Sequence, residues 1–406
     1  MSLPLADPQF WIVTAAAVTA LGFVLRRVFR RKSTAGTGAL PCANCPHAGA
    51  PGHPGSDTGA GRRATVLLLA LTGIAGLAGA EVVEREVAAM GTRLGVLVES
   101  VDRPTGLAVS EAIVAAVDDA ERRLTTWRAA SEIQSFNTAP RASRVALSPL
   151  VWNAMTTALA CWEETGGAFD PTVAPLVEAW GLRHEGRLPT ALEIVRALLF
   201  VDAGSLVLGR ARHEIAQPGG VRIEEGGFGK GAALDAALAA ARTVEPAARV
   251  ALDFGGQLAW TGRPRAFEVR LADPRDRAQA VLALTLSAAS GSLSTSGNSE
   301  RRLVVDGVPV GHLLDPRSGR PAPDIGSATV FSAQATAADC RSTGLFVLGP
   351  KHGAVLMARW SRERQGEAVL LLVEPGGLRA LVTPGLAAQA RALTSEIRIE
   401  TVGEFF

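Results

Sequence analysis

The order of strand-like and helix-like segments after residue 81 constrains the fold of this chain most strongly. Several segments with strand spacing follow one another without a helix between them, which is typical of an α+β fold and not of a strict doubly wound sheet. A helix is expected to begin at Ser148-Pro149 and to end at Gly166-Gly167, because a cap residue followed by proline favours a helix start. Further helices are predicted at residues 107–124, 188–199, 230–243, 335–346 and 351–360. Strands are predicted at residues 94–98, 203–208, 249–254, 266–271, 281–287, 302–305, 327–332 and 368–373.

Two apolar runs precede this region. Phe10–Leu25 is followed at once by five basic residues, so residues 1–32 are predicted to be a transmembrane helix with a basic stop. Residues 33–63 are rich in Gly, Ala, Ser, Thr and Pro and are predicted to be a flexible linker. Residues 64–80 are predicted to be a second transmembrane helix or a signal-peptide core with a small-residue cleavage site. Either alternative places residues 81–406 on the outer, periplasmic side of the inner membrane, because the arginine-rich loop stays inside.

The charge balance and the cysteines exclude some classes of function. A formal net charge of +2 from 41 basic and 39 acidic residues provides no field for nucleic-acid binding. Cys42 and Cys45, with His47 nearby, could form a metal or redox site, but we expect an ordinary reduced loop, because a zinc site needs four ligands. Cys161 and Cys340 stand alone in apolar helical patterns, and no disulfide framework is predicted.

Two segments carry residues suited to phosphate and metal chemistry. Glu224–Asp235 is a glycine-rich turn that opens a helix and contains Lys230. Such a turn either binds phosphate through backbone N–H groups or simply connects strand and helix tightly; it lacks the Walker A order. Asp339 and Thr343, four residues apart on one helix face, either bind Mg²⁺ or serve only the helix start and packing.

Three loops offer further candidate groups. Gly166–Pro175 contains two prolines and is predicted to be a rigid loop that walls a planar ligand. His312, in the segment Gly311–Gly319, either has an ordinary structural role or handles a proton beside phosphate. The run Thr295-Ser296-Gly297-Asn298 adds small hydrogen-bond donors.

The order of these motifs resembles the membrane-associated FAD:protein FMN transferases, the ApbE family. The resemblance covers roughly residues 85–375. It implies a mixed-sheet domain related to the T-fold. The matching elements are Met90-Gly91-Thr92, Trp127 with Ser131–Asn137, Gly167–Pro175, Glu224–Asp235, Leu252–Gly256, Thr295–Gly297, His312–Gly319 and Ala338–Gly349.

The resemblance also implies roles for individual residues. Trp127 stands where family members often have an aromatic residue that stacks on the isoalloxazine of FAD. The Mg²⁺ ligands would be Asp339, Thr343 and the backbone carbonyl of Gly227. The residues implied to line the FAD site are Met90, Trp127, Ala168, Phe169, Asp170, Glu224, Lys230 and Leu314.

The chain departs from the family pattern at two points. Glu224-Glu225 replaces the usual Asp-Leu before the glycine-rich turn, so a second charge is expected at the end of the preceding strand. The chain also has no tyrosine. Neither departure removes an implied metal ligand.

The activity implied is transfer of the FMN part of FAD to a Thr or Ser hydroxyl of a partner flavoprotein, with release of AMP. His312 is the candidate catalytic residue for proton handling or phosphate contact. Three alternatives stay open: an FAD pyrophosphatase that uses water as the acceptor, a flavin-binding protein without chemistry, and a membrane thiol or metal relay at Cys42 and Cys45.

Overall fold

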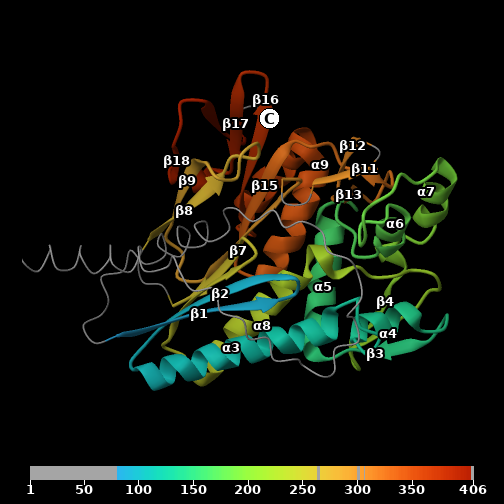
Figure 1. The fold of residues 1–406 in the computed structure, drawn as a ribbon, viewed down its shortest axis with the longest axis horizontal. Coiled ribbons are helices and arrows are strands. Elements are labelled where there is room, and N and C mark those ends of the chain that lie inside the picture. Colours follow the sequence, from blue (N-terminus) through green and yellow to red (C-terminus); the bar gives the residue numbers. More distant parts are fainter. Residues whose placement is uncertain (1–79, 263–265, 300–301, 306, 404–406) are drawn as a thin grey trace, which may run out of the picture. The chain divides into compact units, whose positions relative to one another are not determined.

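The computed structural model describes residues 80–262, 266–299, 302–305 and 307–403. Within them lies a nine-stranded sheet in the order β1-β2-β6-β7-β10-β15-β16-β17-β19 (Figure 1). Every neighbouring pair is antiparallel except β17 and β19, which are parallel. The predicted α+β fold with a mixed sheet is therefore confirmed. The strands are β1 (Glu81–Ala89), β2 (Thr92–Ser100), β6 (Arg249–Phe254), β7 (Gln257–Thr261), β10 (Gly291–Gly297), β15 (Gly326–Ser332), β16 (Glu367–Glu374), β17 (Gly377–Val382) and β19 (Ile397–Thr401).

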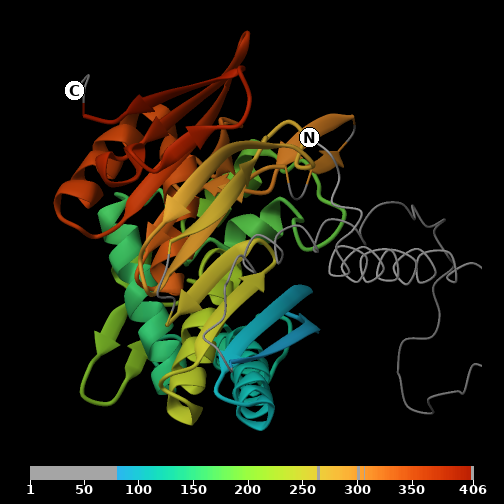
Figure 2. The same cartoon turned by 90° about the vertical axis from the view of Figure 1, so that its left-hand side faces the viewer.

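Helices cover one face of this sheet, and helices α3 and α8 run side by side there (Figures 1 and 2). The alternation of side chains along a strand explains the covering: Val96 and Val98 of β2 pack with Ile113 of α3 in one core, whereas Leu97 belongs to a different core. The helices are α3 (Arg103–Leu124), α4 (Glu132–Thr138), α5 (Pro149–Glu164), α6 (Ala174–Ala179), α7 (Ala191–Leu198), α8 (Gly229–Val244), α9 (Ala335–Arg362) and α10 (Pro384–Ala387).

A smaller sheet covers the opposite face. Its order is β18-β9-β8, and Leu282 and Leu284 of β9 share a buried core with Leu97, Val369 and Leu371 of the large sheet. Strands of the large sheet that lie between the two layers are therefore buried on both faces, as in β16, where residues 368–372 are all buried and apolar. The remaining strands are β8 (Phe267–Ala272), β9 (Ala280–Leu286), β18 (Ala390–Ala392), β3 (Arg144–Ala146), β4 (Val207–Gly209), β5 (Glu214–Ala216), β11 (Arg302–Val305), β12 (Val308–Gly311), β13 (Leu314–Asp315) and β14 (Arg320–Pro321).

Two predicted elements need correction. The strand predicted at 203–208 is instead a turn of 3-10 helix, η2 (Ala203–Ser205), followed by β4. The helices predicted at 335–346 and 351–360 form one element, α9, interrupted where Gly349 has φ 67° and ψ −175° and Pro350 follows. Proline lacks the N–H that would continue the helix ladder, so the break occurs there.

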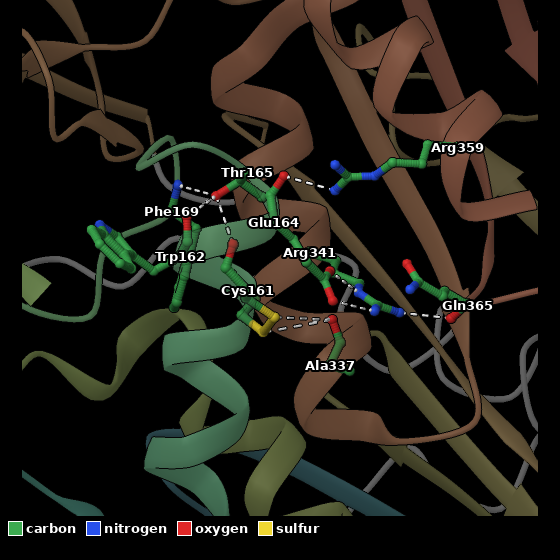
Figure 3. A network of polar contacts seen from close by, with 10 residues as sticks. Cys161, Trp162, Glu164, Thr165, Phe169, Ala337, Arg341, Arg359 and Gln365 are labelled. Atoms are coloured by element: carbon green, nitrogen blue, oxygen red, sulfur yellow. Dashed lines mark hydrogen bonds and ion pairs between the residues drawn. A yellow bond between two sulfur atoms is a disulfide. The ribbon is translucent and has the colours of Figure 1, made fainter. Parts of the chain in front are cut away.

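The expectation that the chain has no disulfide framework missed one bond. Cys161 of α5 and Cys340 of α9 form a disulfide, with their Cα atoms 6.1 Å apart (Figure 3). Because 179 positions separate them in the sequence, spacing alone did not connect them. The same two helices are joined by Arg341, which donates two hydrogen bonds of 2.8 Å to the Glu164 carboxylate. At the end of α5, Thr165 Oγ1 accepts a 3.1 Å hydrogen bond from Phe169 N–H, so this junction also fixes the loop that follows.

The predicted membrane segments at 1–32 and 64–80 and the linker at 33–63, with Cys42 and Cys45, lie outside the described residues apart from Ala80. Among the helices that the structure does describe, none combines the length and the apolar character needed to cross a bilayer.

Candidate active site

A cavity of about 1450 Å³ opens beside the β1–β2 turn, and its wall includes all twelve residues singled out from the sequence. These residues come from segments far apart in the chain, so the fold brings together what the sequence motifs only suggested separately. They are Met90, Trp127, Ala168, Phe169, Asp170, Glu224, Gly227, Lys230, His312, Leu314, Asp339 and Thr343.

The glycine-rich turn packs closely against the start of α9. The 3-10 helix η3 (Glu225–Gly227) leads into α8, which begins at Gly229. A Cβ atom at Gly231 would lie 2.3 Å from the carbonyl oxygen of Ala335, so only glycine allows this approach. The Asp235 carboxylate then accepts hydrogen bonds of 2.8 and 2.9 Å from the N–H groups of Ala335 and Thr336. A side chain of α8 thus caps α9 and sets the position of Asp339 and Thr343.

The three predicted metal ligands meet at this junction. Asp339 is 3% exposed, and its carboxylate accepts from Gly231 N–H at 3.1 Å and lies 3.9 Å from Lys230 Nζ. Thr343 Oγ1 lies 3.2 Å from the hydroxyl of Ser296. A Cβ atom placed on Gly227 would be 3.5 Å from Thr343 Oγ1, so these two positions are neighbours. One carboxylate with hydroxyl and carbonyl oxygens is a donor set that suits Mg²⁺.

The β1–β2 turn forms another part of the wall. Met90 and Gly91 have φ of 45° and 70°, as in the two-residue turns that match the twist of a hairpin. A left-handed backbone is uncommon for methionine, and Met90 N–H donates a 2.9 Å hydrogen bond to the Glu121 carboxylate of α3. Glu121 therefore fixes the turn that presents Met90 to the cavity.

Glu224 and Glu225 are both held in the wall, but by different partners. Burial and the adjacent Glu225 carboxylate together raise the pKa of Glu224 to about 7, even though the ion pair with Arg183 lowers it. Glu225 begins η3, and its Oε1 accepts a 3.0 Å hydrogen bond from Thr126 N–H. The expectation that the second acid would add a charge to a strand was therefore wrong.

The predicted rigid loop turns back on itself through Asp170. The Asp170 carboxylate accepts a 2.7 Å hydrogen bond from Thr172 N–H and one of 3.3 Å from Ala203 N–H, and burial raises its pKa. Residues 174–179 of this region form α6 rather than loop, with Pro175 in its first turn. Ala168 and Phe169 are buried beside the cavity. Asp170 therefore shapes the wall chiefly through its own loop.

Some residues of the wall have no signal in the sequence. Arg183 lies in the loop after α6, outside every motif, and contacts Glu224 and Trp127. Glu121 lies within the regular charge pattern of α3. Ser296, by contrast, belongs to the run of small donors that the sequence did indicate.

The comparison with known proteins identifies the family. The family model described as "ApbE family" matches residues 90–370. The FAD:protein FMN transferase of Salmonella typhimurium is 30% identical over 306 residues, which cover 73% of this chain and 85% of that protein. The protein of the same name from Escherichia coli strain K12 is 28% identical over the same shares.

Solved structures of ApbE proteins have a similar fold. The crystal structure of the ApbE protein of Thermotoga maritima is similar with a TM-score of 0.66 and 28% identity, covering 72% of this chain and 94% of that one. The flavinyl transferase ApbE of Pseudomonas stutzeri gives a TM-score of 0.66 at 23% identity, covering 76% and 97%, which supports the fold alone. Since the family match spans more than half of the chain and includes every residue of the predicted site, the chain belongs to the ApbE family.

Proposed function

We propose that this chain transfers the FMN part of FAD to a Thr or Ser hydroxyl of a partner flavoprotein and releases AMP. The observation that carries the proposal is the single cavity whose wall contains all twelve residues implied for this reaction. Membership of the ApbE family and the names of the relatives, FAD:protein FMN transferases, support the same activity.

The reaction exchanges the phosphoanhydride bond of the FAD pyrophosphate for a phosphoester bond to the acceptor hydroxyl. The acceptor hydroxyl oxygen forms a bond to the FMN-side phosphorus, the bond from that phosphorus to the bridging oxygen breaks, and the bridging oxygen leaves on AMP. Lys230 and the N–H groups at the start of α8 supply positive potential for the pyrophosphate. His312 lies in the cavity wall and is the group we assign to the hydroxyl proton or to phosphate contact.

The oxygen donors of Asp339, Thr343 and Gly227 would hold Mg²⁺. The donor chemistry fits this ion, because it prefers oxygen ligands and takes others from phosphate. When bound, Mg²⁺ neutralises charge on the pyrophosphate and on the leaving oxygen. The role of this chain is to keep the three donors together, through the glycine contact of Gly231 and the cap from Asp235.

We place the catalytic domain on the periplasmic side of the inner membrane, anchored through the N-terminus. The sequence pattern of residues 1–80 supports this location. The disulfide between Cys161 and Cys340 supports it independently, because such bonds persist mainly in oxidising compartments.

The test is a reconstituted transfer reaction. The protein is incubated with FAD, Mg²⁺ and a candidate acceptor flavoprotein, and the intact mass of the acceptor is followed together with AMP. The expected result is an acceptor heavier by one FMN on Thr or Ser, with AMP formed in equal amount. Rapid AMP release without any acceptor would instead identify a pyrophosphatase, and FAD retained without turnover would identify a flavin-binding protein.

Removal of the metal tests the Mg²⁺ requirement. Treatment with EDTA is expected to stop FMN transfer, and excess Mg²⁺ is expected to restore it. Transfer that continues at the original rate after complete removal of divalent ions would contradict the metal assignment while leaving the transfer activity itself established.

A further inference from the structure

Arg183 joins two parts of the cavity wall that are distant in sequence. Its Nη2 donates a 2.7 Å hydrogen bond to Thr126 Oγ1 and another hydrogen bond to the Glu224 carboxylate. Its guanidinium carbon lies 5.4 Å from the centroid of the Trp127 ring. The Arg183 side chain is 28% exposed, so these contacts are partly shielded from water and stronger than they would be on an open surface.

The Trp127 ring has the Arg183 guanidinium over one of its faces. The Trp127 residue is 64% exposed, and the Arg183 guanidinium makes a cation–π contact with its ring. A large aromatic residue left this exposed at the mouth of a cavity has one face available to a ligand. The guanidinium lies over the ring, so the indole can offer only its other face.

Arg183 also offsets negative charge in the cavity wall, where Glu224 and Glu225 lie. Glu224 and Glu225 are adjacent acids beside a cavity that we propose for a ligand with two phosphate charges. Lys230 lies near Asp339, at 3.9 Å, and Arg183 pairs with Glu224. Without Arg183, the acidic pair would face the anionic ligand with one positive group fewer.

We infer that Arg183 is a positioning residue for FAD: it holds the Trp127 indole so that its open face receives the isoalloxazine ring, and it keeps the Glu224 carboxylate beside that ring. This inference rests on the proposed function and deepens it. Arg183 itself does not act on the phosphorus, so its contribution belongs to flavin binding rather than to the chemical step. A guanidinium suits both contacts, because its several N–H donors can pair with Glu224 and Thr126 while the group lies over the indole, whereas a lysine ammonium is a compact point charge.

The test measures FAD affinity and turnover separately in the full chain. Dissociation constants come from the quenching of flavin fluorescence, and KM and kcat come from the transfer assay. Arg183→Leu is expected to weaken FAD binding about tenfold, equivalent to about 1.4 kcal/mol, with kcat at saturating FAD changed less than about twofold. Arg183→Lys is expected to bind FAD with intermediate affinity.

A double-mutant cycle distinguishes positioning from simple loss of charge. If Arg183 acts through Trp127, the variant carrying Arg183→Leu and Trp127→Ala together binds FAD little more weakly than Trp127→Ala alone. Arg187→Leu is the matched control, because Arg187 lies in the same loop and pairs with Glu193, and its FAD affinity is expected to be that of the wild type. If Arg183→Leu fails to fold, Arg183→Gln keeps a donor for Thr126 and replaces it in the cycle.

The possible failures are distinguishable. A wild-type protein that neither binds FAD nor transfers FMN contradicts the proposed function. Two results in a wild-type protein that binds FAD and transfers FMN would overturn only the inference about Arg183. One is an Arg183→Leu variant that binds FAD as tightly as the wild type. The other is a double variant whose loss of FAD affinity equals the product of the losses in the two single variants.

Discussion

Glu224 shows how one residue can be inside a binding cavity and still be costly to ionise. Its carboxylate pairs with Arg183, yet burial and the neighbouring Glu225 raise its pKa to about 7, from an ordinary value of 4.5. The folded chain therefore keeps a proton on Glu224 over a pH range in which the unfolded chain has lost it. Stability is linked to pH through this difference in bound protons.

The first prediction follows because the folded chain binds this proton more tightly than the unfolded chain does. The stabilising contribution of Glu224 is complete below pH 4.5 and is lost progressively as the pH rises to about 7. The free energy of unfolding of the wild type, compared with that of Glu224→Gln, should fall by roughly 3 kcal/mol across this range. Chemical unfolding of both proteins between pH 4 and pH 8 checks this, since other titrating groups are common to both. A constant difference over the whole range would contradict the assigned pKa.

Thr343 allows an equally specific prediction at the metal site. Thr343→Val keeps the shape and removes the oxygen, so the Mg²⁺ concentration needed for half-maximal transfer should rise at least about tenfold. Thr343→Ser keeps the oxygen and is the control. An unchanged Mg²⁺ requirement in the valine variant, shown by titration of the transfer rate, would remove Thr343 from the ligand set.

At the scale of elements, the junction between α8 and α9 decides whether the site exists. The close approach depends on the missing side chain of Gly231, and the start of α9 depends on Asp235. The two helices carry Lys230, Asp339 and Thr343. The catalytic geometry is therefore a consequence of helix packing.

The third prediction tests this packing. Gly231→Ala puts a methyl group 2.3 Å from the Ala335 carbonyl oxygen, so the helices must separate, and the free energy of unfolding should fall by about 1–3 kcal/mol. Gly226→Ala makes the same substitution where the nearest atom is 3.7 Å away and should cost about 1 kcal/mol or less. Denaturant unfolding of both variants measures the difference, and equal losses would count against the tight junction.

Apolar alternation predicted some strands and missed others, among them β1, β17 and β19, whose apolar residues also alternate. Strand β6 was predicted with its correct bounds at 249–254, because its side chains alternate between two cores. Strand β10 was missed, because Gly291–Gly297 consists mainly of small polar residues. A Cβ atom at Gly291 would lie 2.5 Å from the Phe331 ring, so large residues of adjacent strands fill the space that β10 leaves. The motif residues of the site were predictable through the family resemblance of their motifs, whereas Arg183, which lies outside every motif, was not.

At the scale of the whole described region, the disulfide connects the helix before the cavity loop with the helix that carries the predicted metal ligands. Cys161 lies in the last turn of α5, just before Thr165 and the loop at Phe169, and Cys340 directly follows Asp339 in α9. The ion pair between Arg341 and Glu164 reinforces the same contact (Figure 3).

The fourth prediction concerns the stability that this bond provides. Replacement of Cys161 and Cys340 by serine together should lower the free energy of unfolding by about 2–4 kcal/mol, since the long loop is no longer closed in the unfolded chain. The variant with Cys42→Ser and Cys45→Ser is the control and should unfold like the wild type. Urea unfolding under non-reducing conditions provides the comparison, and identical midpoints for all three proteins would contradict a stabilising role.

The bond has a topological consequence for proteolysis. Residues 161–340 form a covalently closed ring, and this ring contains the glycine-rich turn, the loop at Phe169, His312 and Asp339. A protease that cuts the ring once opens it but releases nothing, because both products remain linked through sulfur. On a denaturing gel such a nicked chain keeps its full mass until a thiol reductant is added, and then separates into two pieces.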